Sequence, residues 1–478
     1  MEQPLAAKKR SFFVSTKTRE ETISFSKLAF PMFFSQLALA FIGLNSVIQA
    51  GNYSPDVLAG ILMANSLWFP LFLGLGGIIF FVTPMVAQLY GANKMQEIGP
   101  LVRQAIWLVF PIVLLGVLLL SLGPSFLKLV GVDEGIIGYS KDYLSTFIFA
   151  IPAILLMQPL RSLSEGITKP VPIAIINFIL LGLAIIGNYC FIFGNFGFPE
   201  MGARGAGLSA IIGTWTALTI LIVYLRLSAN YKHTQFFSRF DWPSLSTIKE
   251  ILKGGLPLAA SNFIELSMFS GATLVLGSLG SQVVASHGIA INIGGLLFMV
   301  PLSIGMAAAV RVGNKVGERD FQAARYSSFY SLKFGGILAL FNTLFLLLFA
   351  ELVVSSIWPS DPGVIELAVI LLMFAAFFQI PDSLAMCGMG SLRGYKDTVG
   401  PMIIMLVAYW MFALPFGYSL AITDIWTIQL GAQGMWVGMC IGLVIAASLM
   451  TWRLNSVSYT HLRAHETSLH LVCRLLLE

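Results

Sequence analysis

Two acidic residues, Glu265 and Asp382, are the clearest chemical signal because each falls deep inside a long apolar stretch. Glu265 follows Lys253 by 12 residues, and Asp382 precedes Arg393 by 11 residues. At 1.5 Å per helical residue, these separations are about 18 Å and about 16 Å. We therefore expect both acids near the middle of a hydrocarbon layer about 30 Å thick. An uncompensated carboxylate there costs several kcal/mol, so it should line a cavity and bind a cation or carry a proton.

The partner of these acids is expected to come from outside the chain. No Lys or Arg lies inside the same apolar stretches, so we expect no basic side chain to neutralise either acid. The alternative is that hydrogen bonds hold the acids neutral, from Ser261, Asn262, Ser267 or Ser383. Pro381 directly precedes Asp382, and a proline inside a helix kinks it and frees a carbonyl one turn earlier, on Phe377 or Phe378. That carbonyl could help to coordinate a cation, or the kink could be purely structural.

Other kinds of chemistry have little support in the sequence. There is no Walker A motif, no HExxH and no GxSxG, so neither direct ATP use nor hydrolysis is indicated. Gly74–Gly77 lies inside an apolar stretch without a following Lys-Ser/Thr, which is typical of close helix packing. The four cysteines are scattered, which argues against a disulfide framework or a zinc site. We therefore predict a protein that is not an enzyme and needs no cofactor beyond a coupling ion, Na⁺ or H⁺.

The composition is that of a protein embedded in a membrane. Apolar residues make up 57% of the 478 residues and charged residues only 11%, against about 25% charged in ordinary soluble domains. The net charge of +5 is small and gives no reason to expect a nucleic-acid partner. We predict an all-α polytopic membrane protein whose surroundings are the lipid bilayer.

Twelve apolar runs are long enough to be transmembrane helices. They cover residues 28–50, 57–83, 104–123, 144–160, 171–195, 205–225, 254–277, 283–309, 334–355, 364–390, 399–421 and 432–452. An even number places both termini on one side. With the N-terminal segment 1–26 inside, 23 Lys and Arg residues are cytoplasmic and three are external, so both termini should be cytoplasmic.

The chain also contains an internal repeat. Residues match at a constant offset of 226, as in the pairs Pro31/Pro257, Ser35/Ser261, Gln88/Asn314 and Gly91/Gly317. An offset that spans six helices gives both halves the same orientation, so a pseudo-two-fold axis should run along the membrane normal. We predict two six-helix lobes, 27–225 and 254–453, joined by a basic cytoplasmic linker, 226–253.

The C-terminal segment is unusual. Residues 457–467 read VSYTHLRAHET, and one back-translation of this stretch resembles a transposon-end sequencing adapter. We interpret 457–478 as a non-native tail, the alternative being a genuine cytoplasmic tail. In either case His461, His465 and His470 should not be taken as a metal cluster.

Several motifs in order resemble the multidrug and toxic compound extrusion (MATE) family, in particular its NorM-like branch. They are PxxxSQ at 31–36, PMVAQLYGA at 84–92, LRSLSEG at 160–166, RVGNKVGE at 311–318 and GSLRGYKD at 390–397. The resemblance covers about residues 27–453. It implies twelve helices in two lobes around a central cavity in the bacterial inner membrane. It also implies antiport of organic cations and amphipathic drugs against Na⁺ or H⁺.

The resemblance also suggests roles for particular residues. Glu265 and Asp382 look like the acids that the family carries in helices 7 and 10. If the coupling ion is Na⁺, these two residues would be its ligands. We expect the remaining residues of the cation or substrate cavity to be Asn262, Phe378, Asn188, Gln36 and Met386.

Three positions depart from the family pattern. Ser46 stands where NorM-like proteins carry an aspartate in helix 1, and Ala184 replaces one of two helix 5 asparagines, leaving Asn188. Phe378 replaces a tyrosine that often precedes the helix 10 aspartate by four residues. The cation site of the first lobe therefore looks lost. We expect coupling to run through Glu265 and Asp382, with Na⁺ favoured over H⁺ by family analogy.

Three other functions compete with a monomeric drug/cation antiporter. A flippase for a lipid-linked precursor would need a cationic cavity for pyrophosphate, and no basic residue is expected there. An intramembrane enzyme would need a nucleophile–base pair or metal ligands. A channel would not account as simply for the paired halves.

Overall fold

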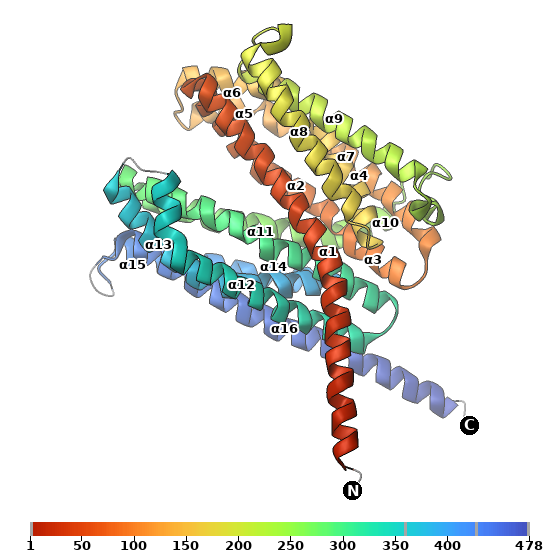
Figure 1. The fold of residues 1–478 in the computed structure, drawn as a ribbon. Coiled ribbons are helices and arrows are strands. Elements are labelled where there is room, and N and C mark those ends of the chain that lie inside the picture. Colours follow the sequence, from red (N-terminus) through yellow and green to blue (C-terminus); the bar gives the residue numbers. More distant parts are fainter. Residues whose placement is uncertain (1–2, 358–360, 426–428, 476–478) are drawn as a thin grey trace.

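The computed structural model describes residues 3–357, 361–425 and 429–475, with side chains described for 18–356, 361–425 and 429–463. The described residues form helices and connecting turns (Figure 1). In chain order the α-helices are α1 (Gln3–Tyr53), α2 (Pro55–Phe80), α3 (Val82–Gly91), α4 (Met95–Ser121), α5 (Gly123–Leu129), α6 (Glu134–Phe147), α7 (Ile151–Gly166), α8 (Val171–Phe193), α9 (Ala203–Leu227), α10 (Leu245–Gly277), α11 (Ser281–Gly317), α12 (Phe321–Ile357), α13 (Pro362–Gly394), α14 (Val399–Met405), α15 (Leu414–Ile422) and α16 (Gly431–Leu475). Short helices η1 (Asn195–Gly197), η2 (Ala229–Thr234) and η3 (Leu406–Ala413) lie between them.

The number of membrane spans agrees with the prediction once a broken helix is counted. Within the described residues, 11 helical segments are long and apolar enough to cross a membrane, or 12 if α6 and α7 form one span. The expected single helix at 144–160 is wrong in detail, because α6 and α7 are bent by 53° at a short break. Pro152 explains the break, since proline fits the first turn of a helix but disfavours helical continuation before it. The predicted N-terminal segment 1–26 continues as helix from Gln3, so α1 begins well before its apolar part.

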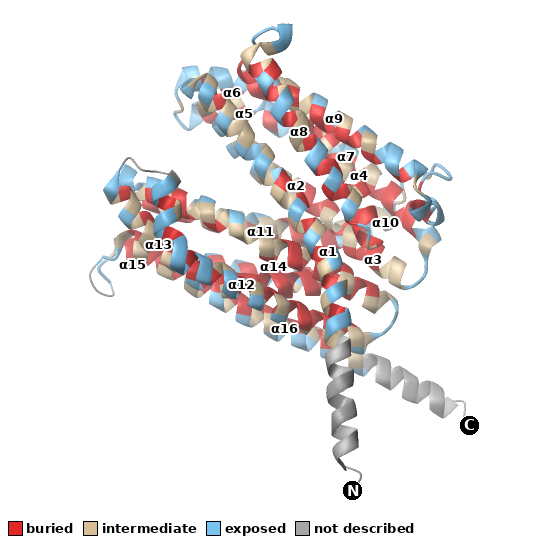
Figure 2. Ribbon diagram, viewed as in Figure 1, coloured by how far each residue is buried: buried red, intermediate tan, exposed pale blue. Residues whose placement is uncertain are grey.

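The helices form two bundles that meet near the end where the termini lie and diverge towards the other end (Figure 1). Buried residues gather inside each bundle and where the bundles meet (Figure 2). One buried cluster is built mainly from α2 to α9 and the other mainly from α11 to α16. We call these the N-lobe and the C-lobe.

The first helix of each half starts against the opposite lobe. In α1, Phe25 and Met32 belong to the C-lobe cluster, whereas Ala50 belongs to the N-lobe cluster. In α10 the order is reversed: Leu258 packs with the N-lobe and Met268 packs with the C-lobe. The predicted boundaries at residues 27 and 254 therefore follow the sequence repeat but not the packing, because part of α1 packs on the C-lobe and part of α10 packs on the N-lobe.

Backbone conformation follows the same repeat. Asn93 and Arg319, 226 residues apart, both have positive φ, at 57° and 59°. Thr168 and Lys396, 228 residues apart, have φ values of 63° and 64°. Each follows the end of a helix, and the next residue's N–H donates to a carbonyl five residues earlier, as for Lys94 to Leu89 at 2.9 Å. This pattern closes the helix ends with a left-handed residue, and it recurs at equivalent turns of both halves.

The lobes meet through a reciprocal contact between repeat-related residues. Gly91, the last residue of α3, packs directly on the carbonyl group of Asn314 in α11, and Gly317, the last residue of α11, packs on the carbonyl of Gln88 in α3. These four residues are the pairs Gln88/Asn314 and Gly91/Gly317 of the sequence repeat. A side chain at either glycine would collide with backbone, so only glycine allows this approach. Gln88 also donates a 2.8 Å hydrogen bond from Nε2 to the Gly394 carbonyl.

We expect Gly91→Val and Gly317→Val each to disrupt this contact, because the added side chain would meet backbone that has no room to move. The measurement is ethidium efflux from cells at matched membrane expression, with an expected loss of about tenfold or more. Gly74→Ala in α2 is the matched control, since nothing lies within 4 Å of a Cβ at that position. Normal efflux by the Gly317 variant would contradict the role assigned to the contact.

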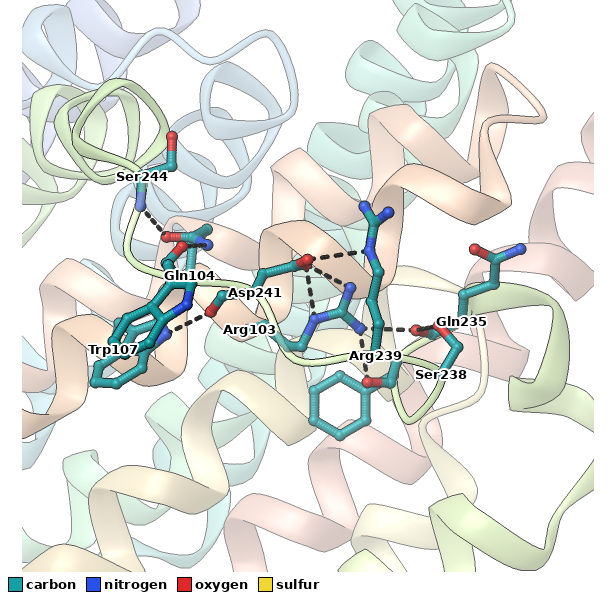
Figure 3. A network of polar contacts seen from close by, with 10 residues as sticks. Arg103, Gln104, Trp107, Gln235, Ser238, Arg239, Asp241 and Ser244 are labelled. Atoms are coloured by element: carbon teal, nitrogen blue, oxygen red, sulfur yellow. Dashed lines mark hydrogen bonds and ion pairs between the residues drawn. The ribbon is translucent and has the colours of Figure 1, made fainter.

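The linker between the halves is fastened to the N-lobe by a buried arginine (Figure 3). Arg103 of α4 forms an ion pair with Asp241 at 2.5 Å and donates to the carbonyls of Gln235 and Phe236 at 2.7 Å. Trp107 donates to the Asp241 carbonyl at 2.9 Å. The segment predicted as a linker, 226–253, is therefore ordered and attached to the N-lobe, and we call it the strap.

A second attachment of the strap lies in η2. The Tyr231 hydroxyl lies 2.8 Å from the Ser164 hydroxyl of α7, and its ring is buried. Burial raises the pKa of the Tyr231 phenol, so this contact is made by a neutral group.

Asp241→Asn should destabilise the protein by about 3 kcal/mol, because it leaves the largely buried Arg103 without its carboxylate. Thermal unfolding of the purified protein in detergent would measure this effect. Asp142→Asn is the control: its partner Arg204 is exposed, so the ion pair contributes little. Equal shifts in the two variants would show that the strap is not held by the Arg103 pair.

Candidate functional site

The two acids selected by depth lie in the C-lobe, on different helices. Glu265 belongs to α10 and Asp382 to α13, and they are close enough for their charges to interact. Neither carboxylate makes a hydrogen bond or ion pair with any residue that the structure describes. The neighbouring hydroxyls are used elsewhere: Ser261 donates to the Pro257 carbonyl at 2.9 Å and Ser267 to the Ile264 carbonyl at 2.8 Å. Hydrogen bonds from these serines therefore do not hold the acids in this conformation.

A buried tyrosine that the sequence reasoning missed lies within electrostatic range of both acids. Tyr409 is 1% exposed and interacts electrostatically with Glu265 and Asp382. It lies in η3, a π-helical stretch directly before Pro415, and such stretches are frequent at functional sites. Phe378 lacks the phenol oxygen that the family often carries at this position, and Tyr409 brings a phenol from a different helix. No spacing or motif in the sequence marked Tyr409.

One basic residue is close enough to influence one of the acids electrostatically. Arg393, in the last turn of α13, interacts electrostatically with Glu265. Its Nε is buried without a hydrogen-bond partner, and one Nη atom contacts Met389 Sδ at 3.2 Å. No ion pair joins Arg393 to Glu265 among the described residues, so the expectation that no basic side chain neutralises either acid stays a prediction.

Phe378 lies in an aromatic stack one turn before Asp382. Its ring stacks on Trp436 of α16 with centroids 5.7 Å apart and an interplanar angle of 17°. Trp436 Nε1 donates to His287 Nδ1 at 3.1 Å, and His287 Nε2 lies 3.0 Å from the Thr273 hydroxyl. Because an indole N–H can only donate, His287 Nδ1 must be unprotonated, which makes this histidine neutral. These contacts hold Trp436, and through it the Phe378 ring, in place one helical turn from Asp382.

Two further predicted residues lie near the acids. Met386, one turn after Asp382, is buried in the C-lobe against Gly305 of α11. Asn262, three residues before Glu265, lies at the crossing of α10 and α2, where its side-chain nitrogen approaches Gly77. Asn262 therefore stands where the acid site borders the N-lobe.

The last two predicted residues are not part of this cluster. Gln36 accepts a 2.9 Å hydrogen bond from Arg161, which is paired with Glu165 at 2.6 Å. Asn188 is buried in the N-lobe, where its Nδ2 donates to the Ser46 hydroxyl at 3.2 Å. The residue that replaces the family aspartate thus contacts the remaining asparagine, and this part of the N-lobe holds neutral polar groups.

No group of three or more His, Cys, Asp or Glu residues capable of holding a metal occurs among the described residues. His461 lies between the rings of Phe321 and Tyr395 rather than beside other histidines. The α16 helix continues to Leu475, and the interpretation of 457–478 as a non-native tail stays a prediction.

Comparison with known proteins identifies the family. The MatE family model matches residues 31–190 and 257–419, one segment in each half of the repeat. The chain belongs to this family. Such proteins are multi-span membrane transporters, so the chain is not an enzyme, as the sequence predicted.

Among curated relatives, multidrug resistance protein PmpM of Pseudomonas aeruginosa is 37% identical over 94% of this chain and 94% of its own length. Multidrug resistance protein NorM of Vibrio vulnificus is 35% identical over 91% of this chain and 96% of its own length. These relatives confirm the NorM-like assignment.

Solved structures show the same fold at lower identity. The eukaryotic MATE transporter AtDTX14 has a TM-score of 0.83 at 20% identity, covering 93% of this chain and 98% of its own. A MATE transporter described as outward-facing has a TM-score of 0.82 at 17% identity, covering 91% of this chain and 96% of its own.

We expect Ser46→Asp to be tolerated, with drug resistance within about twofold of the native protein. The reason is that Asn188 Nδ2 can donate to an aspartate oxygen as it does to the serine hydroxyl. Resistance to ethidium at matched expression is the measurement, with Ser46→Leu as the control that removes the hydrogen bond. Loss of resistance in the aspartate variant alone would show that the N-lobe site takes part in transport.

Proposed function

We propose that this protein is a secondary active multidrug exporter that antiports organic cations and amphipathic drugs against Na⁺ by alternating access. The family and its curated relatives support export of several drugs. The coupling ion and the route that couples it are the parts that we infer from the site.

The main support for cation coupling is the pair of acids in the C-lobe. Glu265 and Asp382 interact with each other and with Tyr409, yet neither carboxylate has a hydrogen bond or salt bridge from the described chain. Two like charges in a nonpolar lobe repel each other and are poorly solvated, so a Na⁺ ion, a proton or a cationic drug would stabilise both. Competition between the ion and the drug for one pair of acids is sufficient for antiport, provided that each favours a different lobe arrangement.

The arrangement of lobes supports an outward-facing state. The lobes contact each other where Gly91 and Gly317 meet, near the ends of the bundles that carry both termini (Figure 1). With both termini in the cytoplasm, as the distribution of Lys and Arg predicts, the contact closes the cytoplasmic side. Binding of Na⁺ to the acids would then precede a change to a state in which this contact opens. We place the protein in a bacterial inner membrane, as a monomer.

We expect an imposed Na⁺ gradient alone to drive ethidium efflux from everted vesicles or whole cells. A pH gradient, imposed separately, is the control. Efflux driven by pH alone would make Glu265 and Asp382 proton carriers and would contradict the Na⁺ proposal. No efflux under either gradient, with the protein present in the membrane, would contradict drug antiport itself.

Glu265→Gln and Asp382→Asn should each reduce gradient-driven efflux by about tenfold or more, because each removes a charge that the coupling ion needs. Membrane expression should stay unchanged, since each replacement keeps the size of the side chain and neither carboxylate has a hydrogen bond or ion pair from the described residues. Glu366→Gln is the control, because Glu366 is an exposed acid near the start of the same helix as Asp382. Retained efflux in both site variants would remove the acids from the coupling mechanism.

A flippase for a lipid-linked precursor is less well supported. It would need free basic side chains to hold a pyrophosphate. Arg161 and Arg311 are paired with Glu165 and Glu21 at 2.6 Å and 2.8 Å, and Arg393 acts on Glu265.

A further inference from the structure

Behind Asp382, a chain of polar contacts crosses the C-lobe. It starts at Pro301 of α11, which has no N–H to give to the carbonyl of Leu297 four residues earlier. Asn342 of α12 supplies the missing donor: its Nδ2 contacts the Leu297 carbonyl at 3.3 Å. The same Nδ2 also donates to Gln379 Oε1 of α13 at 3.3 Å. A proline in one helix is thus compensated by an amide of a second helix, which contacts an amide of a third.

These contacts determine which way the Gln379 amide must point. A backbone carbonyl can only accept, so the atom of Asn342 facing Leu297 must be its amide nitrogen. That nitrogen in turn requires an oxygen from Gln379. The Gln379 amino group is therefore directed away from Asn342. It is fully buried and has no hydrogen-bond acceptor.

An acceptor stands on the same face of the helix. Asp382 follows Gln379 by three residues in α13, and side chains three apart on a helix are neighbours. Asp382 is also buried and has no hydrogen bond from the described residues. A buried donor without an acceptor thus lies next to a buried acceptor without a donor. Each is unfavourable alone, and together they can satisfy one another.

We propose that Gln379 is a positioning residue for Asp382, donating from Nε2 to its carboxylate when that acid is ionised and holds no coupling ion. This inference rests on the proposed function, in which Asp382 alternates between ion-bound and ion-free states. An NH₂ group repels cations, so Gln379 is not an ion ligand; it holds the carboxylate oriented between transport steps. Through Asn342 and Leu297 it also ties the acid to the kink of α11, whose far end is the Gly317 contact with α3.

The first test needs no transport activity. Thermal unfolding of the purified full chain in detergent is compared for the native protein, Gln379→Met, Asp382→Leu and the double variant. We expect Gln379→Met to lower the Tm by about 2 °C or more in the native background. In the Asp382→Leu background it should leave the Tm unchanged or raise it, since the amide then has no acceptor. An equal decrease in both backgrounds would overturn the proposal, because Gln379 would then act only through Asn342.

The second test uses transport and applies even if Asp382→Leu fails to fold. In proteoliposomes, Gln379→Met should lower the concentration of coupling ion for half-maximal ethidium transport by about tenfold, because the variant loses a hydrogen bond made only to the ion-free carboxylate, with the KM for ethidium unchanged. A change in the ethidium KM alone would overturn the proposal. Gln158→Met in α7 is the matched control, since Gln158 is also a buried glutamine with an unpaired amide atom but lies in the other lobe. If the native protein responds to no gradient, the proposed function fails, and the unfolding comparison still decides the role of Gln379.

Discussion

The structure depends on a close approach of backbone between the lobes. Gly91 lies on the Asn314 carbonyl and Gly317 on the Gln88 carbonyl, so the pseudo-two-fold axis passes between two copies of one contact. The earlier parts of α1 and α10 also join the lobes, since each packs on the lobe opposite to the rest of its helix. A contact built from small residues and carbonyl groups, with few interlocking side chains, can separate as a unit. That property suits two rigid lobes that rock about a common end.

Prolines interrupt the regular hydrogen bonding of several spans, and two of them lie near the polar groups of the C-lobe. Pro301 leaves the Leu297 carbonyl to Asn342, which connects three helices of the C-lobe. Pro415 follows a π-helical stretch that contains Tyr409. In a membrane, a freed carbonyl must find a donor within the protein. The polar side chains that meet this need are therefore held near the kinks, and the acid site is built beside them.

The two-lobe fold and the two acids could be predicted, because the depth of a residue in its span and the internal repeat can both be read from the sequence. Glu265 and Asp382 were found by counting residues from the nearest charges. The repeat identified Gly91/Gly317 and Gln88/Asn314 as equivalent positions, although it did not predict that they meet across the lobes. Tyr409 and Arg393 could not be found in this way, since their relation to the acids depends on how α10, α13 and η3 pack. Gln379 was within reach: extending the depth argument from acids to neutral amides would have selected it together with Asn342. Gln36 shows the opposite limit, because a polar residue in an apolar helix can serve an arginine pair instead of the cavity.

The two lobes share their mechanics but not their chemistry. Equivalent left-handed residues close the turns after α3 and α11 and after α7 and α13, so both halves keep the same frame. The acids break this symmetry, since the first-half position matching Glu265 is Leu39 and the N-lobe places Ser46 against Asn188. In the proposed mechanism, charge in one lobe is enough to shift the equilibrium between the two states, because the two lobes move relative to each other about one contact. In the proposed mechanism the ion would therefore act on the C-lobe alone, and the neutral polar groups of the N-lobe would not compete for it.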